Sequence, residues 1–140
     1  EAALELSNTG HLALSTLHAN NAGQAIERVI NMFPQSMHKQ LLMDLSLNVR
    51  GIISQRLIKG KDGKRCAALE ILVMTPHIQD LILKGEIEEI KIAMEESGKK
   101  GMQTFDTALH NLYKEGRIEL EEALNNASSR TNLEAKINFG

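Results

Sequence analysis

Blocks of apolar and polar positions along the chain predict a mixed α/β fold. The run from Leu12 to Leu17 is apolar with small residues interleaved, Gly10 precedes it, and Asn20 and Asn21 follow it. A short apolar run between turn-forming residues predicts a strand that is buried on both faces. Because such strands occur in parallel sheets covered by helices, we expect a parallel sheet here.

The pattern then changes to helical spacing and back to strands. Apolar residues recur every three or four positions over 22–33, and a second amphipathic helix is predicted from Ser36. Segments 49–58 and 66–74 are rich in β-forming residues, and the polar run between them contains Asp62-Gly63. Because an Asp-Gly pair favours a tight turn between paired strands, these segments predict a hairpin.

From Thr75 onward the pattern predicts only helices. Thr75 is an expected N-cap, and Pro76 takes the first helical position. Glycines punctuate predicted helices over 76–84, 86–97, 104–115 and 119–127, and a last helix is predicted near 132–137. Two apolar stripes are expected to form core contacts rather than a ligand pocket: Ile87, Ile90 and Met94, and Phe105, Ala108, Leu109, Leu112 and Tyr113. This change predicts an α/β part over residues 1–75 and a helical subdomain over residues 76–140.

Composition narrows the class of protein. The 140 residues are 42% hydrophobic and carry 16 basic and 18 acidic side chains, enough for one globular domain or half of a larger one with an appendage. The balanced charge predicts no nucleic-acid partner, and no apolar stretch approaches the roughly 18 residues of a membrane helix, so no membrane insertion is expected. The single cysteine, Cys66, excludes an internal disulfide and indicates a reducing cytosol, with Cys66 as a core residue.

Polar side chains cluster at the carboxyl end of the first predicted strand. Thr16 offers a hydroxyl, His18 an imidazole and Asn20 an amide. Because ligands bind outside the carboxyl ends of parallel strands, these residues are the candidate site. At about 3.3 Å per strand residue, His11 would lie roughly 20 Å from His18 and on the opposite face, so the two cannot share a metal ion within this strand. A structural histidine, bonded only to its neighbours, is the alternative for both, and no metal site is predicted.

The chemistry of phosphoryl transfer is missing from these residues. A phosphate-binding loop needs two glycines that flank four residues, followed by lysine and a hydroxyl residue. The nearest stretch, Gly63-Lys64-Arg65, has Ile58 at the first glycine and Arg65 at the hydroxyl position. No acidic strand end suits magnesium either. We therefore expect these 140 residues alone to hydrolyse no nucleotide.

Residues 9–20 read T-G-H-L-x-L-x-T-L-H-x-N and are followed by N-M-F-P at 31–34. This pattern resembles the histidine box of the type II/IV secretion and pilus ATPases, and is most similar to the twitching-motility, pilus-retraction group (the PilT/PilU type). Matching blocks continue at 44–50, 53–57, 68–72 and 101–106. The resemblance covers nearly the whole chain in order.

The resemblance implies a hexameric cytosolic ATPase motor that powers pilus retraction and twitching motility. Each subunit would join a sensory-type domain to a RecA-like P-loop ATPase domain with a helical tail. This chain, which begins without methionine inside a helical pattern, would be the C-terminal part of that ATPase domain followed by the helical subdomain. The phosphate loop and the catalytic acidic segments (Walker A and Walker B) would lie upstream. ATP and Mg²⁺ would bind the full-length enzyme, and the fragment alone would bind neither.

The resemblance also assigns roles and partners. His11 and His18 would sense the γ-phosphate and couple hydrolysis to movement. The supporting residues in the nucleotide region would be Thr16, Asn20, Gln55 and Arg56. Arg56 would meet nucleotide or a neighbouring subunit, with a structural ion pair as an equal alternative. The implied partners are five identical subunits, a companion pilus ATPase and an inner-membrane platform protein at the base of the pilus.

One difference between this sequence and the pattern of the retraction ATPases indicates a branch of the group. The tail motif of retraction ATPases reads A-I-R-N-L-I-R-E-G, whereas residues 77–85 read H-I-Q-D-L-I-L-K-G and lack both arginines. This favours the accessory, PilU-like branch, in which a companion motor supplies part of the function. A pilus-extension or type II secretion ATPase is a second interpretation, although those relatives often carry a four-cysteine metal site. A stand-alone protein-interaction module with structural histidines is the alternative from another class.

Overall fold

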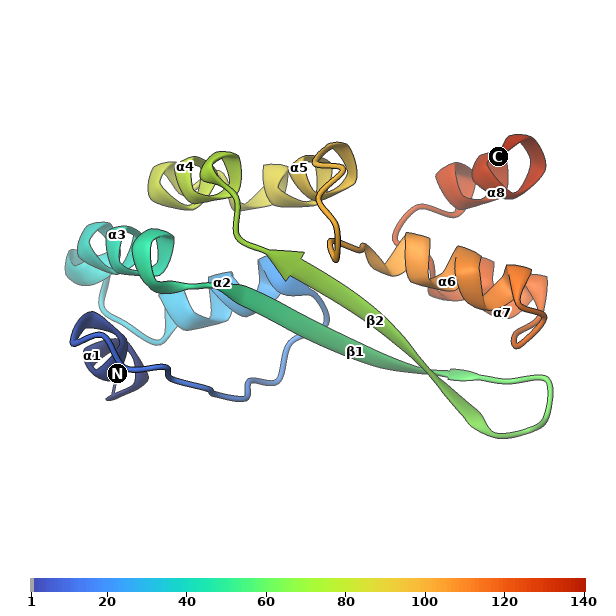
Figure 1. The fold of residues 1–140 in the computed structure, drawn as a ribbon, viewed down its shortest axis with the longest axis horizontal. Helices are drawn as coiled ribbons and strands as arrows, with labels where there is room; N and C mark the ends of the chain where they lie inside the picture. The colour runs from blue at the N-terminus through green and yellow to red at the C-terminus, as the bar shows by residue number, and fades with distance from the viewer. Residues whose placement is uncertain (1) are drawn as a thin grey trace.

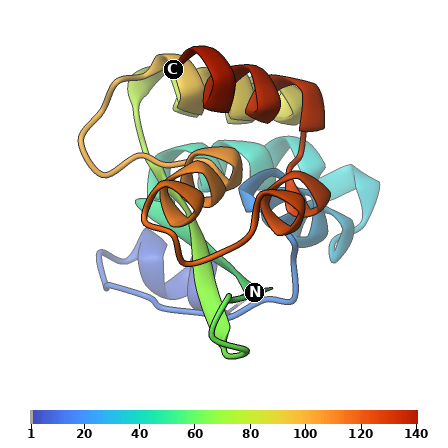
Figure 2. The same cartoon turned by 90° about the vertical axis from the view of Figure 1, so that its right-hand side faces the viewer.

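A computed structural model describes residues 2–140. The elements are α1 (Ala2–Asn8), α2 (Ala22–Asn31), η1 (Gln35–Met37), α3 (His38–Asn48), β1 (Gly51–Lys59), β2 (Arg65–Val73), α4 (Pro76–Lys84), η2 (Ile87–Glu89), α5 (Ile90–Glu96), α6 (Phe105–Lys114), α7 (Leu120–Asn126) and α8 (Arg130–Phe139). A long hairpin crosses the molecule, with α1–α5 gathered near its open end and α6–α8 toward its turn (Figure 1). Figure 2 looks onto the second group and shows α6 and α7 next to each other, with α8 above them.

The hairpin confirms the predicted pair of strands. β1 and β2 are antiparallel, with Gly51 opposite Val73 at the open end and Lys59 opposite Arg65 next to the turn. Gly63 in the turn has φ +77°, a conformation that glycine adopts without strain. The main chain of Gln103 also pairs with Ile71, so the segment before α6 is fastened to β2.

The two faces of the hairpin have different surroundings. The inner face is largely buried and carries Ser54, Arg56, Ile58, Cys66, Ala68, Glu70 and Leu72. The outer face is more exposed and carries Ile53, Gln55, Leu57 and Ala67, with Leu69 and Ile71 half-buried. Cross-strand partners share a face, so this division follows directly from the register.

Two hydrophobic cores share the inner face. The first core joins α2–α5 to Leu72 and Met74 at the open end of the hairpin. The second joins α6–α8 to Ile58, Cys66 and Ala68 near the turn. The predicted apolar stripes of the helices and the predicted core position of Cys66 are confirmed, because these side chains are buried in one core or the other, apart from Tyr113, which is half-buried against the second core.

Local capping explains where several helices begin. Asn21 Oδ1 accepts the Gln24 N–H at 2.8 Å and caps the start of α2. Thr75 Oγ1 accepts the Ile78 N–H at 3.2 Å before α4, and Gly85, with φ +76°, ends that helix. None of the helices between residues 2 and 140 has the length and hydropathy that a membrane span requires.

The predicted buried strand over 12–17 is wrong. Residues 11–19 form neither helix nor strand, and Leu12 and Leu14 are 84% and 89% exposed. A buried strand needs neighbouring strands for its backbone hydrogen bonds and helices to cover it. Within residues 2–140 the strands are β1 and β2, and they pair with each other, so the sheet described is antiparallel rather than parallel.

Candidate functional site

The candidate residues Thr16 and His18 lie in the extended segment that leads into α2. Both side chains are exposed, and neither forms a hydrogen bond with any other residue of the described chain. A hydroxyl and an imidazole without protein partners are free to bind a ligand oxygen. The structure therefore leaves the hydrogen-bonding groups of both residues available.

His11 sits at the other end of this segment, just after α1. Its Nδ1 lies 3.0 Å from Thr9 Oγ1, and the Thr9 hydroxyl donates to the Leu6 carbonyl at 2.8 Å. Because a hydroxyl has one proton, the Nδ1–H of His11 must be the donor to Thr9. Nε2 of the ring stays exposed at the surface, and no contact in the structure brings His11 to His18.

Arg56 fastens the end of the candidate segment. Its Nε and Nη2 donate to the Asn20 carbonyl at 3.3 and 3.2 Å, and its Nη1 donates to the Asn126 carbonyl at 3.1 Å. The guanidinium also lies 4.1 Å from the centre of the Phe105 ring, within the range of a cation–π contact. Within residues 2–140 Arg56 forms no ion pair, and its partners are two main-chain carbonyls and an aromatic ring.

Gln55 is not part of this cluster. Adjacent strand residues face opposite sides of the sheet, which places Gln55 on the exposed outer face of β1 and Arg56 on the inner face. The Gln55 side chain forms no hydrogen bond with another described residue. The structure therefore brings Asn20 and Arg56 together and separates Gln55 from both.

Sequence reasoning missed Glu70, which contacts the same region. Its side chain is buried; Oε1 accepts the Ala22 N–H at 2.8 Å and Oε2 accepts the Phe105 N–H at 3.3 Å. These amides begin α2 and α6, and the positive ends of both helix dipoles favour the carboxylate. A lone acidic residue in the apolar run 66–74 was the signal that could have found it.

Asp106 is a second buried acidic residue that the sequence analysis did not identify. Its Oδ1 accepts the Ser128 N–H at 2.7 Å, and its Oδ2 accepts a hydrogen bond from Lys91 Nζ at 3.2 Å. Two residues earlier, Thr104 Oγ1 accepts the Thr107 N–H at 3.4 Å and caps α6. Hydrogen bonds of Asp106 therefore join α6 to α5 and to the link between α7 and α8.

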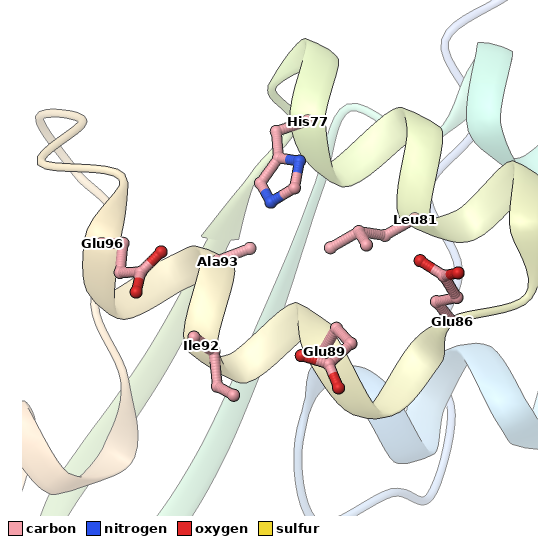
Figure 3. Close-up of a pocket in the computed structure, with 7 residues that line it drawn as sticks. All are labelled: His77, Leu81, Glu86, Glu89, Ile92, Ala93 and Glu96. Carbon is pink, nitrogen blue, oxygen red and sulfur yellow. The ribbon is translucent and has the colours of Figure 1, made fainter.

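A pocket of about 520 Å³ lies between α4 and the η2–α5 segment (Figure 3). Its lining consists of His77, Leu81, Glu86, Glu89, Ile92, Ala93 and Glu96. Three carboxylates would repel phosphate, so the pocket is unsuited to a nucleotide. It contains none of the predicted site residues. Within residues 2–140 no three His, Cys, Asp or Glu side chains are arranged to hold a metal ion.

Comparison with known proteins defines the class. The model of the family described as "Type II/IV secretion system protein" matches residues 1–131. The chain belongs to this family, and the α/β class and the resemblance to secretion and pilus ATPases expected from the sequence are confirmed.

The individual relatives come from pilus motors. The chain is 50% identical over 139 residues to the type IV pilus ATPase PilU of Pseudomonas aeruginosa, covering 99% of this chain and 36% of that protein. It is 38% identical over 131 residues to the type IV pilus retraction ATPase PilT of the same bacterium, covering 94% of this chain and 38% of that protein. A crystal structure of the pilus retraction motor PilT with bound ADP superposes with a TM-score of 0.82 and 35% identity, over 95% of this chain and 37% of that one. This chain thus spans little more than a third of the length of these relatives.

Proposed function

We propose that this chain is the C-terminal part of a pilus-retraction ATPase subunit of the accessory, PilU-like branch. The 50% identity to PilU and the absence of both tail arginines support the branch. Similarity to the ADP-bound structure of PilT supports the use of ATP. In this proposal residues 1–75 complete a RecA-like ATPase core, and residues 76–140 form its helical subdomain.

The observation that carries the proposal is the pair of unpartnered side chains before α2. Thr16 and His18 present a hydroxyl and an imidazole on an exposed segment, and Arg56 holds the carbonyl of Asn20 at the end of that segment. A hydroxyl donates to a phosphate oxygen, and a protonated imidazole does so with the added strength of a charge. These groups can therefore distinguish the presence of a terminal phosphate from its absence.

The hydrogen-bond donors on this chain are suited to detecting a bound nucleotide, but they are not sufficient to bind one. The 140 residues lack the lysine and the glycine-rich backbone of a phosphate loop, and the charged head of Arg56 is occupied by two carbonyls. ATP with Mg²⁺ would therefore be held by an upstream segment, where the metal supplies charge neutralisation. His11, His18, Thr16 and Asn20 would report on the γ-phosphate, and this chain alone would be inactive.

The proposal extends to assembly and location. The subunit would form a homo-hexamer, as the resemblance to the pilus-retraction ATPases implies. It would act in the cytoplasm at the inner-membrane base of a type IV pilus, with a companion pilus ATPase and a membrane platform protein as partners. The names of the relatives, a type IV pilus ATPase and a retraction ATPase, support this setting.

The experiment replaces His18 by alanine in the full-length protein that contains this chain. We expect kcat for ATP hydrolysis to fall by about 10²-fold with an unchanged KM, as when one donor to a developing negative charge is removed. Steady-state phosphate release measures this, and thermal unfolding establishes that the variant is folded. His77→Ala, the same change at an exposed histidine of the α4 pocket, is the control and should leave turnover unchanged. Normal turnover of His18→Ala would exclude His18 from the site.

A further inference from the structure

The boundary between the two cores is a polar layer on the inner face of the hairpin. Along β2, Leu72 belongs to the first core and Ala68 to the second, with Glu70 between them. Across the hairpin, Ser54 is the partner of Glu70 and Arg56 is the partner of Ala68. A buried carboxylate and a half-buried guanidinium therefore lie where the two halves of the molecule meet.

Both charged groups contact each half of the molecule. Glu70 accepts one N–H from α2 and one from α6, helices that begin 83 residues apart, at Ala22 and Phe105. Arg56 donates to the Asn20 carbonyl on one side and to the Asn126 carbonyl, at the end of α7, on the other. The segment that carries Thr16 and His18 thus ends at residues that are linked to α6 through the Glu70 side chain and to α7 through the Arg56 side chain.

These bonds are not needed to start the two helices. α2 already has the Asn21 side chain as its N-cap, and α6 already has Thr104. The Glu70 carboxylate is an additional acceptor that joins both helix ends to one rigid group. If the first turn of α2 moved away from α6, one carboxylate oxygen would be left buried and unpaired, which is strongly unfavourable. The first turns of α2 and α6 are therefore held in a fixed position relative to each other.

We propose that Glu70 and Arg56 are positioning residues that couple the segment carrying Thr16 and His18 to the helical end formed by α6–α8. A displacement of that segment is transmitted to α6 through Glu70 and to α7 through Arg56. The coupling itself is a property of the fold. The further step, that this coupling converts the nucleotide state into movement of α6–α8, rests on the proposed function.

The coupling is tested without nucleotide, by a double-mutant cycle in the full-length protein. Asn21→Ala weakens the start of α2, and hydrogen exchange at the first amides of α6 reports the effect. With Glu70 present, we expect Asn21→Ala to accelerate exchange at Phe105 by several-fold. In the Glu70→Gln background this acceleration should disappear, because the amide group of glutamine accepts one N–H but turns its own NH₂ toward the other.

Matched variants keep the test decisive. Glu121→Gln makes the same chemical change at an exposed acid paired with Arg130, and it should preserve the coupling. Arg56→Gln, at a half-buried site, breaks the second link if Glu70→Gln fails to fold, and it should abolish the response of the Asn126 region to Asn21→Ala. Equal acceleration at Phe105 with and without Glu70 would overturn the inference.

A second measurement separates the coupling from the proposed function. Exchange is recorded over residues 11–24 and 103–110 with and without a non-hydrolysable ATP analogue. If the inference and the proposed function both hold, the analogue protects both regions in the parent protein and only residues 11–24 in Glu70→Gln. Coupling in the mutant cycle with no response to the analogue would support the inference and contradict the proposed function.

Discussion

His110 shows how burial changes the chemistry of a single residue. It lies in α6 within the described chain, and burial lowers the pKa of its imidazole below the ordinary value, with Lys114 and Lys136 adding repulsion. In the unfolded chain the ring has a pKa near 6.5 and binds a proton more readily than in the folded protein. The free energy of unfolding should therefore decrease as the pH falls through 6.5 and level off below the lowered pKa.

Replacing His110 by glutamine should remove this pH dependence. Glutamine has a similar size and does not titrate, so the loss of stability between about pH 7 and pH 5 should be smaller than in the parent protein. Urea unfolding at a series of pH values measures the difference. Parallel stability curves for His110→Gln and the parent would contradict this explanation.

Candidate residues can be selected from the sequence where their chemistry is local. Thr16, His18 and Asn20 were selected because hydroxyl, imidazole and amide groups follow one apolar run, and their role stays a prediction, with the Thr16 and His18 side chains exposed in the structure. The role of Glu70 depends on two backbone amides far away in the sequence. No local pattern specifies such partners, so the sequence offered only an acid in an apolar strand.

At the scale of elements, the Thr75 cap of α4 allows a direct test. The Thr75 hydroxyl accepts the Ile78 N–H at the start of a helix whose Ile78, Leu81 and Ile82 are buried in the first core. Thr75→Ala should therefore lower the free energy of unfolding by about 1 kcal/mol, the usual value of an N-cap. Chemical denaturation measures it. Thr131→Ala, in the exposed first turn of α8, is the control and should change stability by less than about 0.5 kcal/mol.

Elements built from local interactions were predicted well, and the one that needs distant partners was not. The α4 helix was predicted over its observed residues, 76–84, because its cap, first proline and final glycine are neighbours in the sequence. The hairpin was also predicted, because its two strands and its Asp62-Gly63 turn follow one another directly in the sequence. Segment 12–17 has the composition of a buried strand, but β1 and β2 form their sheet without it. The composition of a segment gives it a preference for strand structure, but a strand forms only where a partner strand is available.

At the scale of the whole molecule, exposed apolar side chains predict self-association. Ile53 and Leu57 on the outer face of the hairpin are 73% and 54% exposed, and Leu12 and Leu14 are exposed as well. Apolar surface of this kind favours contact with another chain. In sedimentation velocity, the 140-residue chain should therefore form concentration-dependent oligomers.

Charged substitutions on the outer face test the origin of that association. The double variant Ile53→Lys and Leu57→Lys should shift the sedimentation profile toward the monomer. Leu83→Lys, at a leucine of α4 with similar exposure, is the matched control and should leave the profile as in the parent. A parent chain that stays monomeric at every concentration would show that these side chains do not drive association.

The contacts of Glu70 and Arg56 have a consequence for the evolutionary record of this chain. Both side chains bind main-chain atoms: the amides of Ala22 and Phe105, and the carbonyls of Asn20 and Asn126. Every non-proline residue supplies an N–H, and every residue supplies a carbonyl. Mutations at positions 20, 22 and 126 can therefore accumulate without a compensating change at 56 or 70, whereas Phe105 also contacts Arg56 through its ring. Covariation between aligned sequences would miss most of these connections between the two halves of the molecule.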